Sequence, residues 1–263
     1  MKLKPLKKFG QNYLTDKNII KKIISEFNPQ ENDSIIEIGP GTGALTREIS
    51  NKVMQFKAVE IDTRVIDSLV NEMPGLEIIN QDFLKLELAK VYPSKNKIRI
   101  IGNIPYNITS PILFKLIENR FSVHDALLMV QYDVAKRMTA NISTKDYGIL
   151  SVLLNYFADV KICFKISPNV FYPKPKVWSA LIHIIFNKQT DSKLEDKFFI
   201  NVVKASFGHR RKTLKNSLTN SIFADINLDS DTLKLKRRAE ELSVSDFLEL
   251  STKIKEQLDG RRD

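Results

Sequence analysis

Short apolar runs rich in β-branched residues alternate with amphipathic stretches over residues 1–187. The apolar runs have the length and composition of buried strands, and they predict strands at residues 34–38, 55–61, 76–80, 98–102, 126–130, 160–166 and 180–186. The stretches between them have apolar residues at helical spacing, which predicts helices at 18–27, from about 44, and at 63–72, 111–118, 133–139 and 149–157. This alternation is typical of an α/β domain built on one sheet.

The pattern changes after residue 187, where the apolar positions follow only the helical period. It predicts helices near 194–207, 211–221, 232–242 and 245–258. A polar stretch at 187–192 separates the two patterns. We therefore predict an α/β sheet domain over residues 1–187, which begins with an N-terminal arm at 1–28, and a small all-helical C-terminal domain over residues 188–263.

Positive charge is concentrated in two segments of a chain whose formal net charge is +10. Residues 1–28 contain seven lysines and two acidic residues, and residues 160–188 contain five lysines and no acidic residue. Residues 29–159 are nearly neutral. Such asymmetry is typical of a protein that binds a polyanion, and a solubilising lysine surface is the alternative interpretation.

Composition disfavours several classes of protein. The single cysteine, Cys163, excludes a disulfide framework and favours a reducing compartment, so a cytoplasmic location is expected. No apolar run approaches the roughly 20 residues of a membrane span, so no membrane partner is expected. Three histidines and Cys163 are scattered along the chain, and no metal site is predicted.

A glycine-rich turn, Gly39-Pro40-Gly41-Thr42-Gly43, connects a predicted strand to a predicted helix. Glycine allows the backbone to approach a ligand closely, and a ligand here also meets the helix N-terminus. Glu60 ends the next strand, where a carboxylate can accept both hydroxyls of a ribose. Asp82 follows the third strand, where its carboxylate can accept the amino group of an adenine. The turn favours a nucleotide-type cofactor, with NAD and S-adenosylmethionine both open, over a tight structural turn.

Asn103-Ile104-Pro105-Tyr106 directly follows the apolar run at 98–102. The Asn103 side-chain oxygen and the Ile104 carbonyl are two acceptors that can hold the two N–H bonds of an exocyclic amine. Pro105 biases Ile104 toward an extended backbone, which aims its carbonyl in advance, and Tyr106 can stack on a base. The tetrapeptide predicts amine methylation by positioning and electrostatics, and the alternative is an ordinary turn at a strand end.

Two further segments have the composition of nucleic-acid contacts. In Phe171-Tyr172-Pro173-Lys174-Pro175-Lys176, we expect Phe171 to provide a second stacking face and Lys174 and Lys176 to contact phosphates. Inward-packed aromatic residues in a structural loop are the alternative. The basic run at 205–215, which includes Arg210, Arg211 and Lys212, suits either a phosphate backbone or a solvated helix face.

Five segments occur in an order that resembles the ribosomal RNA adenine N6,N6-dimethyltransferase family, and the resemblance covers residues 8–250. They are Phe9-Gly10-Gln11-Asn12-Tyr13-Leu14, Glu37-Ile38-Gly39-Pro40-Gly41-Thr42-Gly43, Gly102-Asn103-Ile104-Pro105-Tyr106-Asn107, Phe171-Tyr172-Pro173-Lys174-Pro175-Lys176-Val177 and Phe207-Gly208-His209-Arg210-Arg211-Lys212-Thr213-Leu214. The chain is most similar to the bacterial small-subunit branch of this family. It departs from the usual family pattern at Trp178, where an acid is common, and at His209, where glutamine is common.

The resemblance implies a Rossmann-like, S-adenosylmethionine-dependent methyltransferase domain and a small helical RNA-binding domain. It implies that the cofactor is contacted by the N-terminal arm, by the glycine-rich turn and by the strand ends, at Gln11, Asn12, Leu14, Gly39, Gly41, Glu60, Asp82 and Asn103. It also implies dimethylation of two adjacent adenosines in a hairpin loop near the 3′ end of small-subunit rRNA. The expected partner is a ribosomal subunit precursor, and the expected state of the protein is a monomer.

Alternative functions remain open on the sequence. The same catalytic segments occur in large-subunit rRNA adenine methyltransferases of the macrolide-resistance type. A ribosome assembly factor with little catalysis, a DNA adenine methyltransferase and an NAD-dependent dehydrogenase are the other hypotheses.

Overall fold

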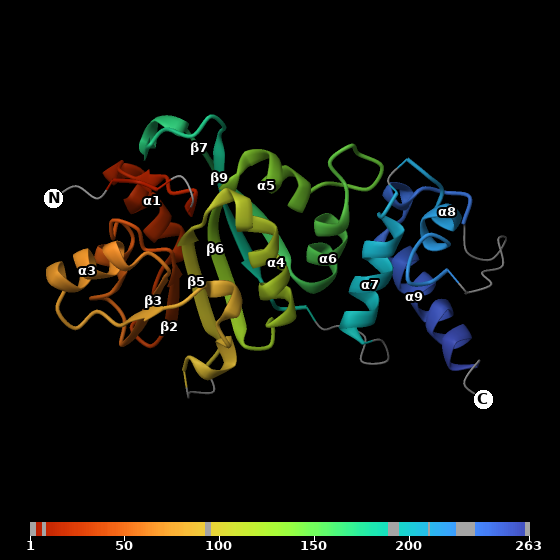
Figure 1. The fold of residues 1–263 in the computed structure, drawn as a ribbon, viewed down its shortest axis with the longest axis horizontal. Helices are drawn as coiled ribbons and strands as arrows, with labels where there is room; N and C mark the ends of the chain where they lie inside the picture. Colours follow the sequence, from red (N-terminus) through yellow and green to blue (C-terminus); the bar gives the residue numbers. More distant parts are fainter. Residues whose placement is uncertain are drawn as a thin grey trace. The chain divides into compact units, whose positions relative to one another are not determined.

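The computed structural model describes residues 4–6, 9–92, 96–188, 195–209, 211–224 and 235–260. The chain forms two compact units (Figure 1). Unit 1 comprises Met1–Ala135 and Asp159–Asn187, and unit 2 comprises Lys136–Ala158 and Lys188–Asp263. Among the described residues, no helix has both the length and the apolar composition needed to cross a membrane.

Unit 1 is built on a seven-stranded sheet with the order β4-β3-β2-β5-β6-β9-β7. Neighbours from β4 to β6 are parallel, and β9 is antiparallel to both β6 and β7. The strands are β2 (Ser34–Ile38), β3 (Gln55–Glu60), β4 (Ile78–Asn80), β5 (Ile98–Asn103), β6 (Val123–Gln131), β7 (Asp159–Ile166) and β9 (Ser179–Ile185). This mostly parallel sheet with helical connections confirms the predicted Rossmann-like α/β class.

Three helices lie between consecutive parallel strands: α2 (Thr46–Ile49), α3 (Thr63–Glu72) and α4 (Thr109–Glu118). Helix α1 (Lys17–Phe27) precedes β2, and α5 (Tyr132–Met138) follows β6. In α1, Ile20, Ile23, Ile24 and Phe27 form one buried face, as their spacing predicts. That face packs in one core cluster with sheet residues such as Ile101. Burial of this kind stabilises a fold by about 1.5–3 kcal/mol for each large apolar side chain.

A small antiparallel pairing joins the N-terminal arm to the proline-rich loop. Strand β1 (Tyr13–Leu14) pairs with β8 (Phe171–Tyr172), so that Leu14 lies opposite Phe171. The Thr15 N–H extends the contact by donating to the Val170 carbonyl at 2.9 Å. The sequence does not predict this pairing, because two-residue strands carry no periodic signal.

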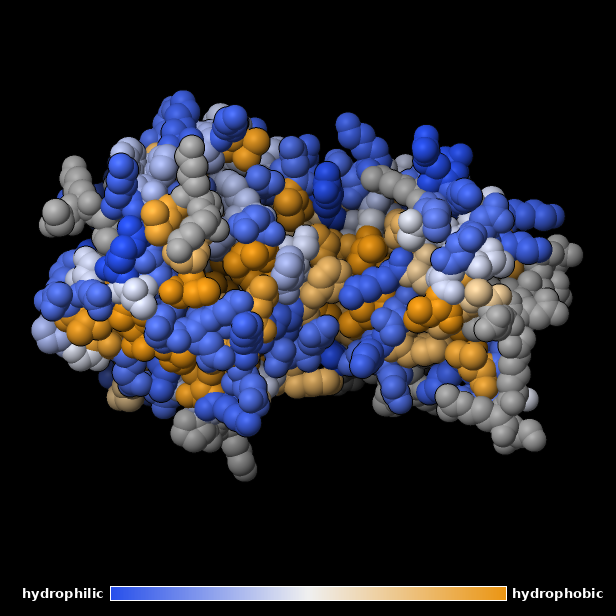
Figure 2. All heavy atoms as spheres, in the orientation of Figure 1, coloured by the Kyte–Doolittle hydropathy of each residue, from blue (hydrophilic) through white to orange (hydrophobic). Residues whose placement is uncertain are grey.

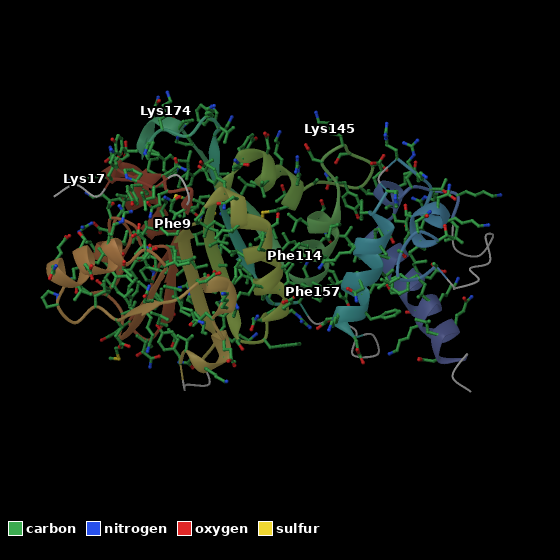
Figure 3. All side chains as sticks on the ribbon, viewed as in Figure 1. Phe9, Lys17, Phe114, Lys145, Phe157 and Lys174 are labelled. Carbon is green, nitrogen blue, oxygen red and sulfur yellow. The ribbon has the colours of Figure 1, made fainter. Side chains whose placement is uncertain are left out.

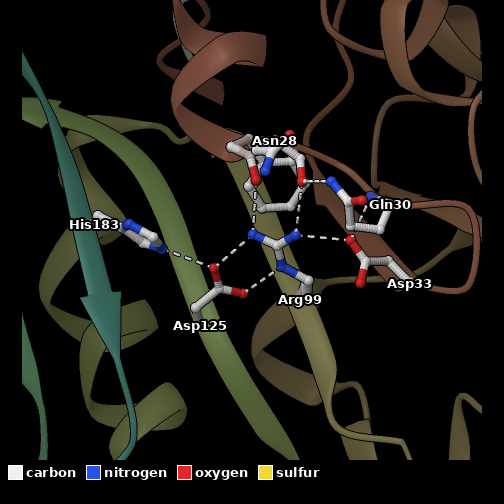
Figure 4. Close-up of polar contacts among 7 residues, drawn as sticks. Asn28, Gln30, Asp33, Arg99, Asp125 and His183 are labelled. Atoms are coloured by element: carbon white, nitrogen blue, oxygen red, sulfur yellow. Dashed lines mark hydrogen bonds and ion pairs between the residues drawn. The ribbon is translucent and has the colours of Figure 1, made fainter.

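A half-buried polar cluster around the buried Asp125 joins the start of β5 to the end of α1 (Figure 4). The Arg99 guanidinium donates to Asp125 at 2.9 and 2.8 Å, to Asp33 at 2.7 Å and to the Phe27 carbonyl at 2.7 Å. Asp125 also lies 2.7 Å from Nε2 of His183. Burial alone would raise the pKa of Asp125, but hydrogen bonds from His183 and Arg99 hold it below its usual value. The cluster therefore stabilises the end of the sheet opposite to Asn103.

Unit 2 is helical, with α6 (Ile149–Phe157), α7 (Asp196–Ser206), α8 (Leu214–Leu218), α9 (Val244–Asp259) and the short 3-10 helix η6 (Ala239–Glu241). Its core contains Phe157 and Phe199, whose ring centroids lie 6.2 Å apart, and Phe207 and Phe247, which stack at 5.8 Å. The expected helix at 211–221 is shorter than predicted, and the expected helix at 232–242 lies partly outside the described residues.

The division of the chain differs from the predicted one in one segment. One boundary lies between Asn187 and Lys188, where the sequence pattern changes, but Lys136–Ala158 belongs to unit 2 and not to the sheet domain. The reason is packing: Phe157 lies among the aromatic rings of unit 2, and the Tyr147 hydroxyl donates to the Leu242 carbonyl at 2.9 Å. Figure 2 shows hydrophilic side chains over much of the visible face, with hydrophobic residues gathered between them.

Candidate active site

A cavity of about 240 Å³ lies at the carboxyl ends of the parallel strands of unit 1. Ligands of open α/β sheets bind in this position. The cavity brings together most of the residues that the sequence singles out: Gln11, Asn12, Leu14, Gly39, Gly41, Glu60, Asp82, Asn103, Ile104, Pro105 and Tyr106. Residues from separate parts of the chain therefore converge on one concave surface.

The glycine-rich turn forms one wall and requires its glycines. Gly39 and Gly41 have φ angles of +64° and +53°, in the left-handed region that side chains disfavour. A Cβ atom on Gly41 would also lie 2.9 Å from the ring of Tyr13. The turn, at Gly41, is therefore in close contact with the N-terminal arm, at Tyr13, where both line the cavity.

One carboxylate, Glu60, ends β3, and another, Asp82, follows the end of β4. Glu60 is 7% exposed, and its Oε1 accepts hydrogen bonds from the backbone N–H groups of Ile61 at 2.8 Å and Asp62 at 2.9 Å. Burial raises the pKa of the Glu60 carboxyl, and these N–H groups oppose that rise. Asp82 accepts a hydrogen bond from the Leu84 N–H at 2.9 Å, which orients its carboxylate beside the cavity.

Glu37 is a third carboxylate of the cavity, which sequence reasoning missed as a site residue. It lies on β2, is 2% exposed, and accepts a hydrogen bond from the Thr46 hydroxyl at 2.7 Å. Burial raises the pKa of Glu37 to about 7. The available signal was an acidic residue within an otherwise apolar strand, two positions before the glycine-rich turn.

A hydrogen-bonded latch holds the N-terminal arm at the cavity. Nε2 of Gln11 donates to the Asp62 carboxylate at 3.0 Å, and Oε1 of Gln11 accepts from the Leu6 N–H at 2.8 Å and from the Tyr13 hydroxyl at 2.9 Å. The Arg64 guanidinium lies 2.6 Å from Asp62, and its hydrogen bond lowers the pKa of that carboxyl. Asp62 is therefore a fixed anchor for the arm, a role that the sequence does not reveal.

Asn103 and Ile104 both line the cavity, and each carries an acceptor oxygen. Nδ2 of Asn103 donates to the Asn12 carbonyl at 2.6 Å. Because a carbonyl can only accept, this bond fixes the amide orientation and leaves Oδ1 of Asn103 as an acceptor. Neither this oxygen nor the Ile104 carbonyl accepts a hydrogen bond from the described residues. Polar groups of this kind require a partner when a ligand displaces water.

Tyr106 also lines the cavity, and a hydrogen bond of its hydroxyl fixes its ring. Its hydroxyl shares a hydrogen bond of 2.6 Å with the Ser179 hydroxyl, at the start of β9. Burial raises the pKa of the Tyr106 phenol, so the ring is neutral at physiological pH. The side chain can therefore present a flat, uncharged face without titrating.

Phe171 does not occupy the position expected of a second stacking face. Its side chain is 4% exposed, packs in the core cluster and lies opposite Leu14, and it is not among the residues that line the cavity. The pairing of β1 with β8 turns this ring inward and turns its neighbour Tyr172, 63% exposed, outward. The inward-packed alternative for Phe171 therefore describes this structure.

The lysines and arginines predicted to contact RNA lie in two places. Lys174 and Lys176 are exposed on the loop after β8 in unit 1, and Lys174 lies at its outer edge (Figure 3). Arg211 and Lys212 are exposed in unit 2, before α8. Arg210 lies outside the described residues.

Comparisons with known proteins match nearly the whole chain. The profile of a family described as "Ribosomal RNA adenine dimethylase" matches residues 3–256. A "Ribosomal RNA small subunit methyltransferase A" from Chlorobium phaeobacteroides (strain BS1) is 45% identical over 249 residues, which cover 95% of this chain and 93% of the relative. A protein of the same name from Francisella tularensis subsp. novicida (strain U112) is 44% identical over 256 residues, which cover 95% and 97%.

Two solved structures share the fold. The crystal structure of a dimethyladenosine transferase from Plasmodium falciparum superposes with a TM-score of 0.78 and 26% identity, covering 93% of this chain and 98% of that one. The 23S rRNA methyltransferase ErmE superposes with a TM-score of 0.65 and 25% identity, covering 93% and 100%.

Proposed function

Because the chain belongs to the ribosomal RNA adenine dimethylase family, we propose that it dimethylates the N6 amines of two adjacent adenosines in small-subunit rRNA, with S-adenosylmethionine as methyl donor. The observation that carries the proposal is the pair of available acceptors, Oδ1 of Asn103 and the Ile104 carbonyl, at a cavity that also contains a glycine-rich turn and carboxylates. Together these groups suit a nucleoside cofactor beside a base that carries an amine.

The groups of the cavity fit the proposed cofactor. The backbone at Gly39 and Gly41 allows a close approach, the Glu60 carboxylate suits ribose hydroxyls, and Asp82 suits an adenine amine. Asn12 and Leu14 contribute the wall that the arm provides, and the latch at Gln11 fixes that arm. When bound, S-adenosylmethionine supplies an electrophilic methyl group on a positively charged sulfur.

The chain activates the substrate amine by holding its hydrogens. The lone pair of an adenine amine is delocalised into the ring, which makes the nitrogen a poor nucleophile. If Oδ1 of Asn103 and the Ile104 carbonyl accept the two N–H bonds, the nitrogen becomes pyramidal and its lone pair is released. Pro105, with φ −59° and ψ 133°, follows directly and restricts Ile104 to an extended backbone. The rate enhancement then comes from orientation and fixed dipoles.

Tyr106 holds the plane of the base. Its ring borders the cavity and its hydroxyl is bound to Ser179, so stacking on it costs little side-chain entropy. Base–aromatic stacking is worth about 1–3 kcal/mol. Because Phe171 is buried, we assign stacking to Tyr106.

The proposed substrate is a precursor of the small ribosomal subunit. The protein is proposed to bind it as a monomer, in the cytoplasm. The relatives named for small-subunit methylation are 44–45% identical to this chain, whereas the large-subunit enzyme ErmE is 25% identical. We propose that four exposed basic residues contact phosphates: Lys174 and Lys176 in unit 1, and Arg211 and Lys212 in unit 2. Unit 2 is accordingly the proposed RNA-binding domain.

A labelled methyl donor tests the proposal. The protein is incubated with labelled S-adenosylmethionine and, separately, with unmethylated small subunits, with large subunits and with duplex DNA. Label in small-subunit RNA is expected. Label in large-subunit RNA alone would favour the activity named for ErmE, and label in DNA alone would overturn the RNA substrate. Small subunits that bind but take up no label would indicate a non-catalytic assembly factor.

A further inference from the structure

Exposed apolar side chains cluster on the segment between β8 and β9. Among the described residues, nine large hydrophobic side chains are exposed, and three of them lie within seven residues: Tyr172, Val177 and Trp178. Trp178 is 47% exposed. Groups of exposed apolar side chains such as these three mark interaction surfaces.

A cation lies against the Trp178 ring. Nζ of Lys165, on β7, is 4.5 Å from the centroid of the Trp178 ring and 4.5 Å from that of Tyr132. The Tyr132 N–H donates to the Trp178 carbonyl at 2.9 Å, so the backbone beneath the indole is fixed. The ring is thus held in place beside a positive charge while part of its surface faces solvent.

The position of Trp178 relates it to the candidate active site. The next residue, Ser179, is fully buried, and its hydroxyl shares the 2.6 Å hydrogen bond with Tyr106. Successive residues of an extended chain point to opposite sides. Ser179 therefore holds the ring of Tyr106 on the inside, while Trp178 presents its indole on the outside, one residue away.

The charge of the segment that carries the indole indicates what it binds. Residues 160–188, which include Lys165, Lys174 and Lys176, carry five lysines and no acidic residue. An apolar protein partner needs no such excess, whereas single-stranded RNA offers phosphates to the lysines and a flat base to the ring. The surface therefore favours an unpaired nucleotide over an apolar partner.

We propose that Trp178 is a stacking platform for an unpaired base that flanks the target adenosine in the rRNA loop, with Lys165 placed to contact the adjoining phosphate. The inference rests on the proposed function, because the target adenosine is the base placed beside Tyr106. Trp178 is a substrate-positioning residue: it lowers the KM for RNA and takes no part in the transfer of the methyl group.

Trp178 is the only tryptophan of the chain, so fluorescence excited at a wavelength where tyrosine does not absorb reports on this side chain alone. An unmethylated RNA hairpin with an adenosine-containing loop is titrated into the wild-type protein. Stacking is expected to quench the emission, and a fully paired RNA duplex of equal length, which has no unpaired base, is expected to quench much less. Equal quenching by both RNAs, or none by either, would overturn the proposal.

Steady-state kinetics with unmethylated small subunits gives an independent readout. Trp178→Ala is expected to raise the KM about 10-fold with kcat nearly unchanged, and Trp178→Phe, which keeps a stacking ring, is expected to restore most of the lost affinity. Phe121→Ala removes another exposed aromatic ring, 71% exposed, before β6, and is expected to leave KM unchanged. An unchanged KM for Trp178→Ala would contradict the proposal.

The two ideas fail in different ways. If the wild-type protein methylates small subunits but shows neither quenching nor a KM effect at Trp178, the stacking platform is wrong and the proposed function stands. If the wild-type protein transfers no methyl group to small subunits, the proposed function is wrong, whatever the fluorescence shows.

Discussion

The Asn103 side chain donates to the backbone carbonyl of Asn12 across 2.6 Å, which connects the candidate chemical residue to the N-terminal arm. The bond joins positions 91 residues apart in the chain. It settles the orientation of the amide, because only the NH₂ group can donate to a carbonyl. The Asn103 acceptor is therefore oriented before any ligand binds, and the arm that lines the same cavity helps to orient it.

Removal of this side chain should reduce methyl transfer sharply. Asn103→Ala deletes one of the two acceptors, and loss of one preorganised group of this kind costs about 10²–10³ in kcat. RNA affinity should change little, because the phosphate contacts are elsewhere. Single-turnover transfer of labelled methyl groups to unmethylated small subunits measures the rate of methyl transfer. Filter binding measures the RNA affinity.

Asn80→Ala is the matched control. Asn80 also ends a parallel strand and donates from Nδ2 to a backbone carbonyl, that of Glu60 at 3.0 Å, but it does not line the cavity. Its substitution should leave kcat within a few-fold of wild type. Equal losses at Asn80 and Asn103 would show that the effect is structural and not chemical.

Loosening the latch of the N-terminal arm should weaken cofactor binding. Gln11→Ala removes the bond to the Asp62 carboxylate and the acceptor for the Tyr13 hydroxyl. A hydrogen bond to a charged group contributes about 1.5–3 kcal/mol, so the Kd for S-adenosylmethionine should rise at least about 10-fold. Isothermal calorimetry provides the measurement. Gln30→Ala, at an exposed position, should leave this Kd unchanged, and an unchanged Kd for Gln11→Ala would remove the latch from the account.

Glu37 should make stability depend on pH between about 4.5 and 7. Its pKa rises on folding from 4.5 to about 7, so the folded state binds the proton more tightly. The stabilising contribution of that proton is present in full below about pH 4.5 and is lost as the pH rises through about 7. Glu37→Gln should therefore exceed wild type in free energy of unfolding by up to about 3 kcal/mol at pH 8, and match it near pH 4.5.

Urea unfolding of the cofactor-free protein across this pH range provides the measurement for Glu37. Thr46→Val gives a second point, because it removes the hydroxyl that favours the charged carboxylate, so the pKa of Glu37 should rise further and the fall in stability should extend to higher pH. A difference between Glu37→Gln and wild type that does not vary with pH would show that the carboxyl titrates alike in both states.

The lysines after β8 should contribute to the salt dependence of RNA binding. If Lys174 and Lys176 each neutralise one phosphate, replacing either by alanine should reduce the slope of log affinity against log salt by about 0.7–0.9. Fluorescence anisotropy with a labelled rRNA hairpin at several salt concentrations gives the slope. Lys52→Ala, at an exposed position before β3, should leave the slope intact. If all three variants keep the wild-type slope, Lys174 and Lys176 do not contact phosphates and serve only solubility.

The sequence predicts the sheet, and it predicts that Asn103 lies at the end of a strand, for a physical reason. Buried parallel strands require runs such as Ile98–Asn103, and their carboxyl ends place Glu60 and Asn103 at one edge without further information. Glycines at positive φ in a short turn are equally local features. These predictions depend on residues close together in sequence, so a single pattern carries them.

The remaining features depend on long-range contacts. The pairing of Leu14 with Phe171 buries a ring that its sequence neighbours suggest is exposed, and the packing of Phe157 against Phe199 moves a segment into unit 2. The role of Asp62 arises from a side chain 51 residues away. No local periodicity encodes such partners, so propensity and spacing could not reveal them.

Mass spectrometry of nucleosides from small-subunit RNA measures the proposed chemistry itself. Small subunits that lack the modification are incubated with S-adenosylmethionine and with the wild-type protein or Asn103→Ala, and their RNA is digested to nucleosides. The wild-type protein is predicted to produce N6,N6-dimethyladenosine, and Asn103→Ala is predicted to produce little or none in the same time. Absence of dimethyladenosine with the wild-type protein, or equal amounts with both proteins, would contradict the account.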